Sequence, residues 1–160
     1  MDNTDKFSAI TETTIRFRLA EVNTYYFQQN PPLKPFDQNN PSLIDYNLNF
    51  ALPNKIEDNR VSIICKIEAL IKETLERIGE IQTEFKFEID SINDKPIKSS
   101  EKIGIPQDII TTFVSITIST MRGIMIEKFR GTLLQHQLLP VINPTVITQN
   151  LLADNNQTNK

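Results

Sequence analysis

Four segments of the chain alternate apolar and polar residues with a period of two, the pattern of strands with one buried face. The segments span residues 14–27, 42–52, 61–71 and 78–89. In the first of them the alternation slips near Val22, which predicts a β-bulge, and Tyr25 and Phe27 are expected back on the apolar face. In the last, the polar face carries Gln82, Glu84, Lys86 and Glu88 and is expected to face solvent. Strands buried on one face only predict an antiparallel sheet.

The connection between the first two strands is rich in proline. Its prolines, which exclude a helix, are Pro31, Pro32, Pro35 and Pro41. The connection is too long for a tight hairpin, so we expect a crossover loop between strands that are not joined by a turn. The loop also carries Leu33 and Phe36. Apolar residues in a loop either fasten it to the protein or line a binding groove, and both possibilities stay open here.

Residues 106–128 give conflicting signals. Ile110, Val114, Ile116 and Ile118 alternate with polar residues and are β-branched, so propensity alone favours a strand. Pro106 and Asp108, however, form a helix start, and the length of the segment suits a helix. A helix gathers most of the apolar side chains on one broad arc: Ile109, Ile110, Phe113, Val114, Ile116, Met121, Ile124 and Met125. We therefore predict a long helix whose apolar arc packs on the sheet.

A second side of this helix carries small residues, namely Thr112, Ser115, Ser119 and Gly123. Such a stripe permits the close approach of another helix, which a second subunit would supply. After the helix, Gly131 is a stop signal, and an extended arm leads to Asn143 and Pro144. A short second helix is expected near residues 145–152, with Val146, Ile147 and Leu151 on its packing side. We expect one domain over residues 14–152, with flexible tails at 1–13 and 153–160.

Composition and charge exclude several classes of function. The chain has 160 residues, 39% of them hydrophobic, and a net charge of -3. This charge provides no basic stripe for nucleic acid and no surface for anionic lipid. Cys65 is the single cysteine, so an internal disulfide is excluded and a cytoplasmic location is expected. The acidic N-terminus shows no signal peptide.

The sequence disfavours two further interpretations, a membrane span and an enzyme. Residues 109–126 are long enough to span a membrane, but they contain Arg122 and several Ser and Thr residues, which favours a helix buried in protein. An enzyme is disfavoured because no phosphate-binding glycine loop is present, and His136 is the only histidine. Cys65 lies in the middle of a strand on its apolar face, where a structural thiol is expected. The sequence predicts no metal and no cofactor.

The segment from Arg130 to Val141, RGTLLQHQLLPV, resembles the bacterial SecB export-chaperone family. Members end their long helix with Arg-Gly-Thr, followed by an apolar or aromatic residue, a glutamine and an apolar-Pro-Val step. The order of elements is also similar. The resemblance implies an α+β fold with a four-stranded antiparallel sheet, a Pro-rich crossover loop, a long C-terminal helix on one face and a short second helix.

The resemblance further implies an ATP-independent holdase that binds unfolded or precursor polypeptides in apolar grooves. Leu33, Phe36, Val146, Ile147 and Leu151 would contact the client, and the small-residue stripe would lie in an interface of a homotetramer built as a dimer of dimers. The tail after Leu152 is unlike the family tail that docks on the SecA translocase motor. A member that accompanies a toxin–antitoxin pair is one alternative. Others are a module for a single protein partner and a small-ligand binding protein.

Overall fold

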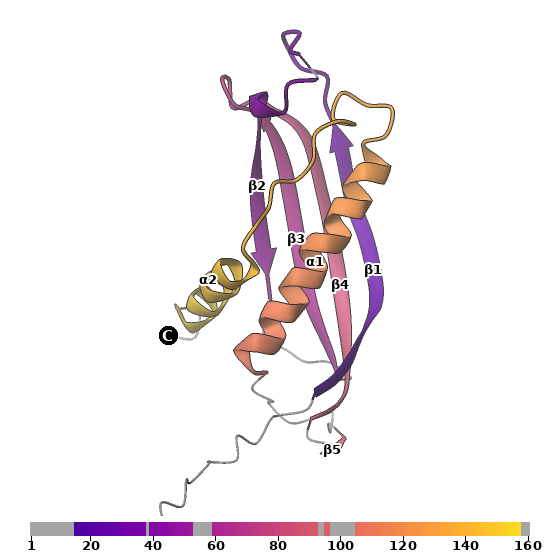
Figure 1. Cartoon of the computed structure of the whole chain (residues 1–160), viewed down its shortest axis with the longest axis vertical. Helices are drawn as coiled ribbons and strands as arrows, with labels where there is room; N and C mark the ends of the chain where they lie inside the picture. Colours follow the sequence, from indigo (N-terminus) through magenta and orange to yellow (C-terminus); the bar gives the residue numbers. More distant parts are fainter. Residues whose placement is uncertain (1–14, 38, 53–58, 93–94, 97–104, 158–160) are drawn as a thin grey trace, which may run out of the picture.

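A computed structural model describes residues 15–37, 39–52, 59–92, 95–96 and 105–157. It has the predicted α+β architecture, with a long antiparallel sheet covered on one face by a helix (Figure 1). The strands are β1 (Ile15–Gln29), β2 (Ile44–Ala51), β3 (Arg60–Ile71), β4 (Arg77–Ile92) and the two-residue β5 (Lys95–Pro96), preceded at β2 by the 3-10 turn η1 (Pro41–Leu43). The order is β1-β4-β3-β2, with β5 paired to β4. β1 and β2 are thus edge strands, joined by the crossover loop.

The slip in the first apolar pattern corresponds to real bulges. β1 shifts register against β4 at three places, between Arg16 and Phe17, between Leu19 and Glu21, and between Thr24 and Tyr26. These bulges let a long edge strand bend around the helix. The sequence pattern predicted that Tyr25 shares the apolar face with Phe27, and this is wrong. The last bulge turns the Tyr25 side chain to the polar face of the sheet. There the Tyr25 hydroxyl accepts a hydrogen bond from the Gln82 side chain of β4 at 3.5 Å.

The long helix is α1 (Gln107–Lys128), so the helical alternative was correct for the segment with conflicting signals. Asp108 lies in its first turn, where a carboxylate interacts favourably with the helix dipole. As a helix, the segment buries Ile110, Phe113 and Val114 against the sheet in one turn. A strand would instead have turned every second residue toward solvent. Packing of the apolar arc therefore outweighs the modest strand preference of the β-branched residues.

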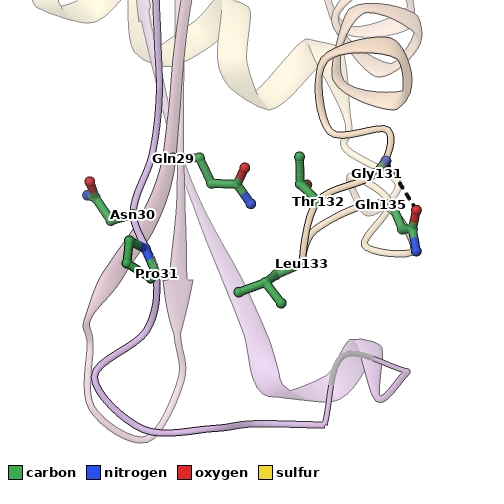
Figure 2. A pocket seen from close by; sticks show the side chains of 7 residues that line it. All are labelled: Gln29, Asn30, Pro31, Gly131, Thr132, Leu133 and Gln135. Atoms are coloured by element: carbon green, nitrogen blue, oxygen red, sulfur yellow. Dashed lines mark hydrogen bonds between the residues drawn. The ribbon is translucent and has the colours of Figure 1, made fainter.

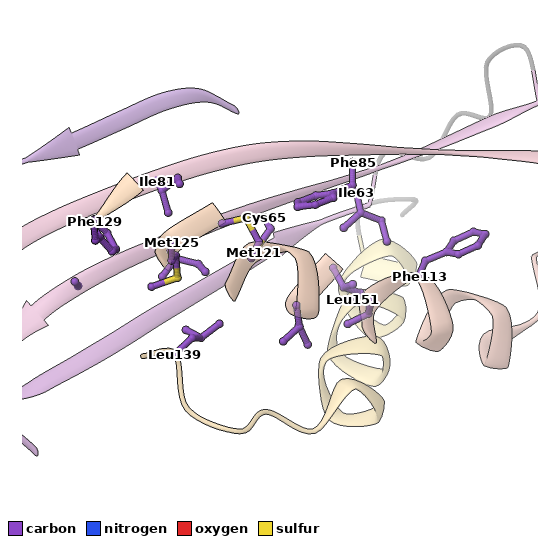
Figure 3. Close-up of a cluster of buried hydrophobic side chains, with 14 of the residues drawn as sticks. Ile63, Cys65, Ile81, Phe85, Phe113, Met121, Met125, Phe129, Leu139 and Leu151 are labelled. Carbon is purple, nitrogen blue, oxygen red and sulfur yellow. The ribbon is translucent and has the colours of Figure 1, made fainter. Parts of the chain in front are cut away.

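The core lies between α1 and the sheet (Figure 3). The predicted inward residues of β4 are fully buried there, including Ile81, Phe85 and Phe87. Phe113 of α1 stacks on Phe87 with ring centroids 4.3 Å apart, and it meets the edge of Phe17 at 4.8 Å. This cluster joins the helix to two neighbouring strands and fixes how α1 crosses the sheet.

An extended arm follows α1 and returns across the same face of the sheet (Figure 1). Gly131 adopts a positive φ of 75°, as expected for a helix stop. Arg122 of α1 donates to the Pro140 carbonyl at 2.7 Å, and the Tyr46 hydroxyl of β2 donates to the Gln137 carbonyl at 3.1 Å. These bonds hold the arm between α1 and β2.

The second helix, α2, spans Pro144–Gln157 and lies beside β2 (Figure 1). The Asn143 side chain accepts a hydrogen bond from the Thr145 backbone at 3.0 Å, which caps the helix start. The helix continues past Leu152, where the sequence pattern had it end. Residues 153–157 of the expected tail are therefore helical, while residues 1–13 and 158–160 of the expected tails lie outside the described part of the chain.

The face of the sheet away from α1 is covered by ion pairs. Glu21 pairs with Lys86 at 2.9 Å and with Arg60 at 2.8 Å, and Glu88 pairs with Arg18 at 2.9 Å. Hydrogen bonding by Lys86 lowers the pKa of Glu21, and hydrogen bonding by Arg18 lowers that of Glu88. The polar side of the strand pattern thus carries a network of matched charges.

Candidate functional site

An apolar groove lies between β2 and α2, and we call it the α2–β2 groove. It encloses a cavity of 210 Å³ lined by Leu48, Asn49, Phe50, Ile147, Asn150 and Leu151. Four of these side chains are apolar, and the two asparagines place amide groups among them. Ile147 is half-buried and Leu151 is buried against the core. A groove of this composition suits an apolar side chain whose neighbouring main chain needs hydrogen-bond partners.

The structure brings together two of the predicted client contacts, Ile147 and Leu151, and leaves Val146 beside them with 49% of its surface exposed. It does not bring Leu33 and Phe36 to the same place. Those two residues belong to the crossover loop at the opposite end of β2 from α2 (Figure 1). The crossover loop and α2 are therefore separated by about the length of β2, which has eight residues. At about 3.3 Å per residue, an extended client segment of similar length would reach from one to the other.

The two crossover-loop residues differ in role. Phe36 is partly buried and packs against the core, so the fastening role that the sequence left open applies to it. Its contact with a client stays a prediction. Leu33 is 89% exposed, and its backbone N–H donates to the Glu76 carboxylate at 2.8 Å. Leu33 therefore presents a free apolar side chain from an anchored backbone.

A second hollow lies where the crossover loop meets the Arg-Gly-Thr segment (Figure 2). Its volume is 460 Å³, and it is lined by Gln29, Asn30, Pro31, Gly131, Thr132, Leu133 and Gln135. The Gly131 N–H donates to the Gln135 side-chain carbonyl at 3.2 Å, so the loop closes on itself. The Thr132 hydroxyl similarly donates to the Phe129 carbonyl at 2.6 Å. The segment that carried the family resemblance thus has a clear structural task, which is to end α1 and start the arm.

The edge strand β1 carries an exposed apolar surface. Its large exposed side chains are Val22, Tyr25, Tyr26 and Phe27, with exposed fractions of 39% to 53%. A groove of 480 Å³ beside it is lined by Val22, Thr24, Gly123, Ile124, Glu127 and Lys128. A long edge strand with exposed aromatic side chains is a surface that sheet proteins ordinarily cover.

The small-residue stripe of α1 faces away from the sheet. Thr112, Ser115, Ser119 and Gly123 are all exposed, and an added Cβ at Gly123 would meet nothing within 4 Å. The Ser119 hydroxyl donates to the Ser115 carbonyl at 2.9 Å, so part of the stripe's polarity is satisfied within the helix. α1 is also long and apolar enough to span a membrane by length and composition, with 39% of its most apolar window buried in the protein.

The chemically reactive residues do not form a catalytic arrangement in the part of the chain that the structure describes. Burial raises the pKa of the Cys65 thiol to about 12, so it stays protonated in the core. His136 is exposed on the loop after α1. Among the described residues no group of three potential metal ligands occurs. The structural role predicted for Cys65 agrees with its burial.

Several residues of the groove are not marked by the sequence pattern. Leu48 and Phe50 lie in the predicted strand 42–52, where the alternation indicates only that they face inward, yet they also line the α2–β2 groove from the sheet side. Asn49 and Asn150 were not singled out, because isolated asparagines carry no pattern. The available signal was that β2 is an edge strand and that the helix beside it carries Ile147 and Leu151, and this signal required the strand order.

Comparison with known proteins bears on the fold. No family model and no curated protein matches the chain. Among solved structures, a SecB-like chaperone of Mycobacterium tuberculosis, in complex with a ChAD peptide from the HigA1 antitoxin, aligns with a TM-score of 0.50 and 13% identity, over 79% of this chain and 91% of that one. A protein of unknown function from Streptococcus agalactiae aligns with a TM-score of 0.40 and 11% identity, over 81% and 98%. The sheet, the crossover loop and the two helices of this chain form a SecB-like fold.

Proposed function

We propose that this protein is an ATP-independent chaperone that holds non-native polypeptides in apolar grooves, acting in the cytoplasm in export or quality control. The observation that carries the proposal is the α2–β2 groove, where Leu48, Phe50, Ile147 and Leu151 line a cavity of 210 Å³ at the edge of the sheet. The SecB-like fold supports the same function.

The chemistry of the groove suits a client without a defined sequence. Its apolar walls interact with any apolar side chain, since the hydrophobic effect is non-directional. Fully burying one Leu, Ile, Val or Phe side chain contributes about 1.5–3 kcal/mol. Ordering an unfolded segment cancels much of this gain. Several weak contacts along one extended segment therefore give useful affinity while allowing release without nucleotide.

Assembly would extend the binding surface. We propose that the exposed edge of β1 and the α1 stripe are covered by further copies of this chain in a dimer of dimers. The aromatic residues on β1 and the open space beside Gly123 support contacts of this kind. Packing α1 between subunits would also bury the apolar helix surface that is exposed in a single chain. Protein, and not lipid, would then cover this surface.

A single dedicated partner is the second candidate. The structural neighbour from Mycobacterium tuberculosis was solved with an antitoxin peptide, so one protein of this fold binds a defined segment of one partner. On this hypothesis the groove would select one sequence of apolar residues. A chaperone instead binds many unrelated unfolded chains with similar affinity.

The test is suppression of aggregation. The purified full chain, added without nucleotide to a chemically denatured protein diluted into buffer, should lower the light scattering in proportion to its concentration. Two unrelated denatured proteins should be used, because a dedicated binder would protect neither. Unchanged scattering with both would contradict the chaperone proposal.

A further inference from the structure

The turn between β3 and β4 contains a leucine in an unfavourable backbone conformation. Leu75 has a φ of 57°, in the left-handed region that Gly and Asn adopt readily and leucine does not. The turn is closed by backbone hydrogen bonds from Leu75 to Ile71 at 2.7 Å and from Ile71 to Glu76 at 2.9 Å. A residue with this geometry is ordinarily replaced by glycine or asparagine unless its side chain is needed.

Folding does not account for the leucine. Its side chain is 70% exposed and is not part of the buried core. The unfavourable backbone conformation of Leu75 is therefore not offset by burial of its side chain. A strained backbone that the surrounding structure holds in place is common at binding sites.

The same end of the molecule presents a second exposed leucine. The Leu33 N–H donates to the Glu76 carboxylate at 2.8 Å, and Glu76 follows Leu75 directly in the chain. Asn30 fastens the start of the crossover loop to β4 through a backbone bond to Ile78 at 3.0 Å. Both leucines thus project from anchored segments, at the end of the sheet away from α2 (Figure 1). We call Leu33 and Leu75 the leucine tip.

The small apolar area of the leucine tip and the charges around it limit which kind of partner can bind there. A stable protein interface buries on the order of 1,000 Å² or more, which two leucine side chains do not provide. The charged residues around the tip have both signs, being Lys34, Lys72, Asp37, Glu73 and Glu76. This mixture lacks the basic excess that attracts anionic lipid. A short apolar stretch of an extended polypeptide needs only a small contact, and a rim of mixed charge tolerates many sequences.

We propose that the leucine tip is a contact point for short apolar stretches of a non-native polypeptide, and that Leu75 keeps its unfavourable backbone for that contact. The proposal rests on the chaperone function proposed above and adds a binding element to it. The β3–β4 turn would lengthen the binding surface beyond the crossover loop, at the end of the molecule opposite the α2–β2 groove.

Three variants of the full chain separate the side chain from the backbone. Leu75→Asn relieves the strain and removes the apolar contact, Leu75→Ala keeps the strain and removes the contact, and Leu75→Met keeps both. The probe is a reduced, carboxymethylated and fluorescently labelled protein that stays unfolded. Its affinity is measured by fluorescence anisotropy, and the melting temperature of each variant by circular dichroism.

Leu75→Asn should raise the melting temperature by about 2–4 °C and weaken client binding by about threefold to tenfold. Leu75→Ala should weaken binding equally without the thermal gain, and Leu75→Met should match the original chain. Unchanged affinity of Leu75→Asn, in a protein whose unmodified form binds the client, would overturn this inference alone. No client binding by the unmodified chain would instead overturn the chaperone proposal as well.

Two other results would also refute the inference. A lower melting temperature for Leu75→Asn would mean that the leucine serves folding. Co-sedimentation of the chain with phosphatidylcholine vesicles, lost in Leu75→Asn while client affinity is kept, would make the tip a membrane contact.

Discussion

Ile147 offers the sharpest test of the α2–β2 groove. Its side chain is half-buried, lines the 210 Å³ cavity and packs against the core from α2. A client that covers the smaller part still exposed gains at most about a third of a full isoleucine burial, which is less than about 1 kcal/mol. Ile147→Asp removes this gain and adds the cost of desolvating a carboxylate beside the client. We therefore expect client affinity to fall at least about tenfold, since about 1.4 kcal/mol corresponds to that factor.

The same change also weakens folding, because the larger part of Ile147, which packs on the core, is lost. That loss is about 1–2 kcal/mol, which a domain with an ordinary stability of about 5–15 kcal/mol survives. Gln149→Asp is the matched control. It introduces the same charge on the same helix, at an exposed position outside the groove.

Affinity for an unfolded labelled client should be measured by fluorescence anisotropy for both variants, and folding by circular dichroism and urea titration. The groove account predicts a selective loss of binding in Ile147→Asp. A folded Ile147→Asp protein with client affinity within twofold of the original would refute the reasoning, as would an equal loss in Gln149→Asp.

Three substitutions and one change of pH test other features of the structure. Phe113→Ala should lower the free energy of unfolding by about 3–5 kcal/mol in urea titrations, because Phe113 is fully buried between two aromatic rings. Gly131→Ala should cost about 1 kcal/mol in the same assay; the space for a methyl group is open, so the cost comes from the φ of 75°. Ser119→Glu should reduce the solution mass measured by light scattering, since it places charge on the stripe expected to pack between subunits. Glu88, whose pKa is lowered from 4.5 by hydrogen bonding to Arg18, stabilises the fold above pH 4.5, and this contribution should be lost as acid titration passes below that value.

Much of the fold follows from the sequence pattern. The inward positions alternate along the whole of β3 and along β4 from Ile81 on, and every apolar residue expected there is buried. The helix was harder to predict, because its β-branched residues fit either structure locally. Pro106 and Asp108 marked the start correctly, and the wide apolar arc explains why the helix is preferred once a sheet is present to cover it. Thr117 and Ile118 were not assigned to the apolar arc, yet both are buried, and Thr117 was left out because its side chain is polar.

The binding surface was less predictable for a physical reason. Ile147 and Leu151 form a groove only because α2 lies beside an edge strand, and neither the strand order nor the edge position is encoded locally. Tyr25 shows the same limit at one residue, because a bulge reversed the side chain that simple alternation placed inward. Leu75 could not be noticed from the sequence at all, since a leucine in a polar turn is ordinary until its backbone angle is known.

The most direct test of the central claim is the binding of a permanently unfolded, labelled polypeptide to the purified full chain in the absence of nucleotide. We expect saturable binding that an unlabelled and unrelated unfolded protein displaces, and that Ile147→Asp weakens. An absence of binding at concentrations up to the highest that stay soluble would contradict it.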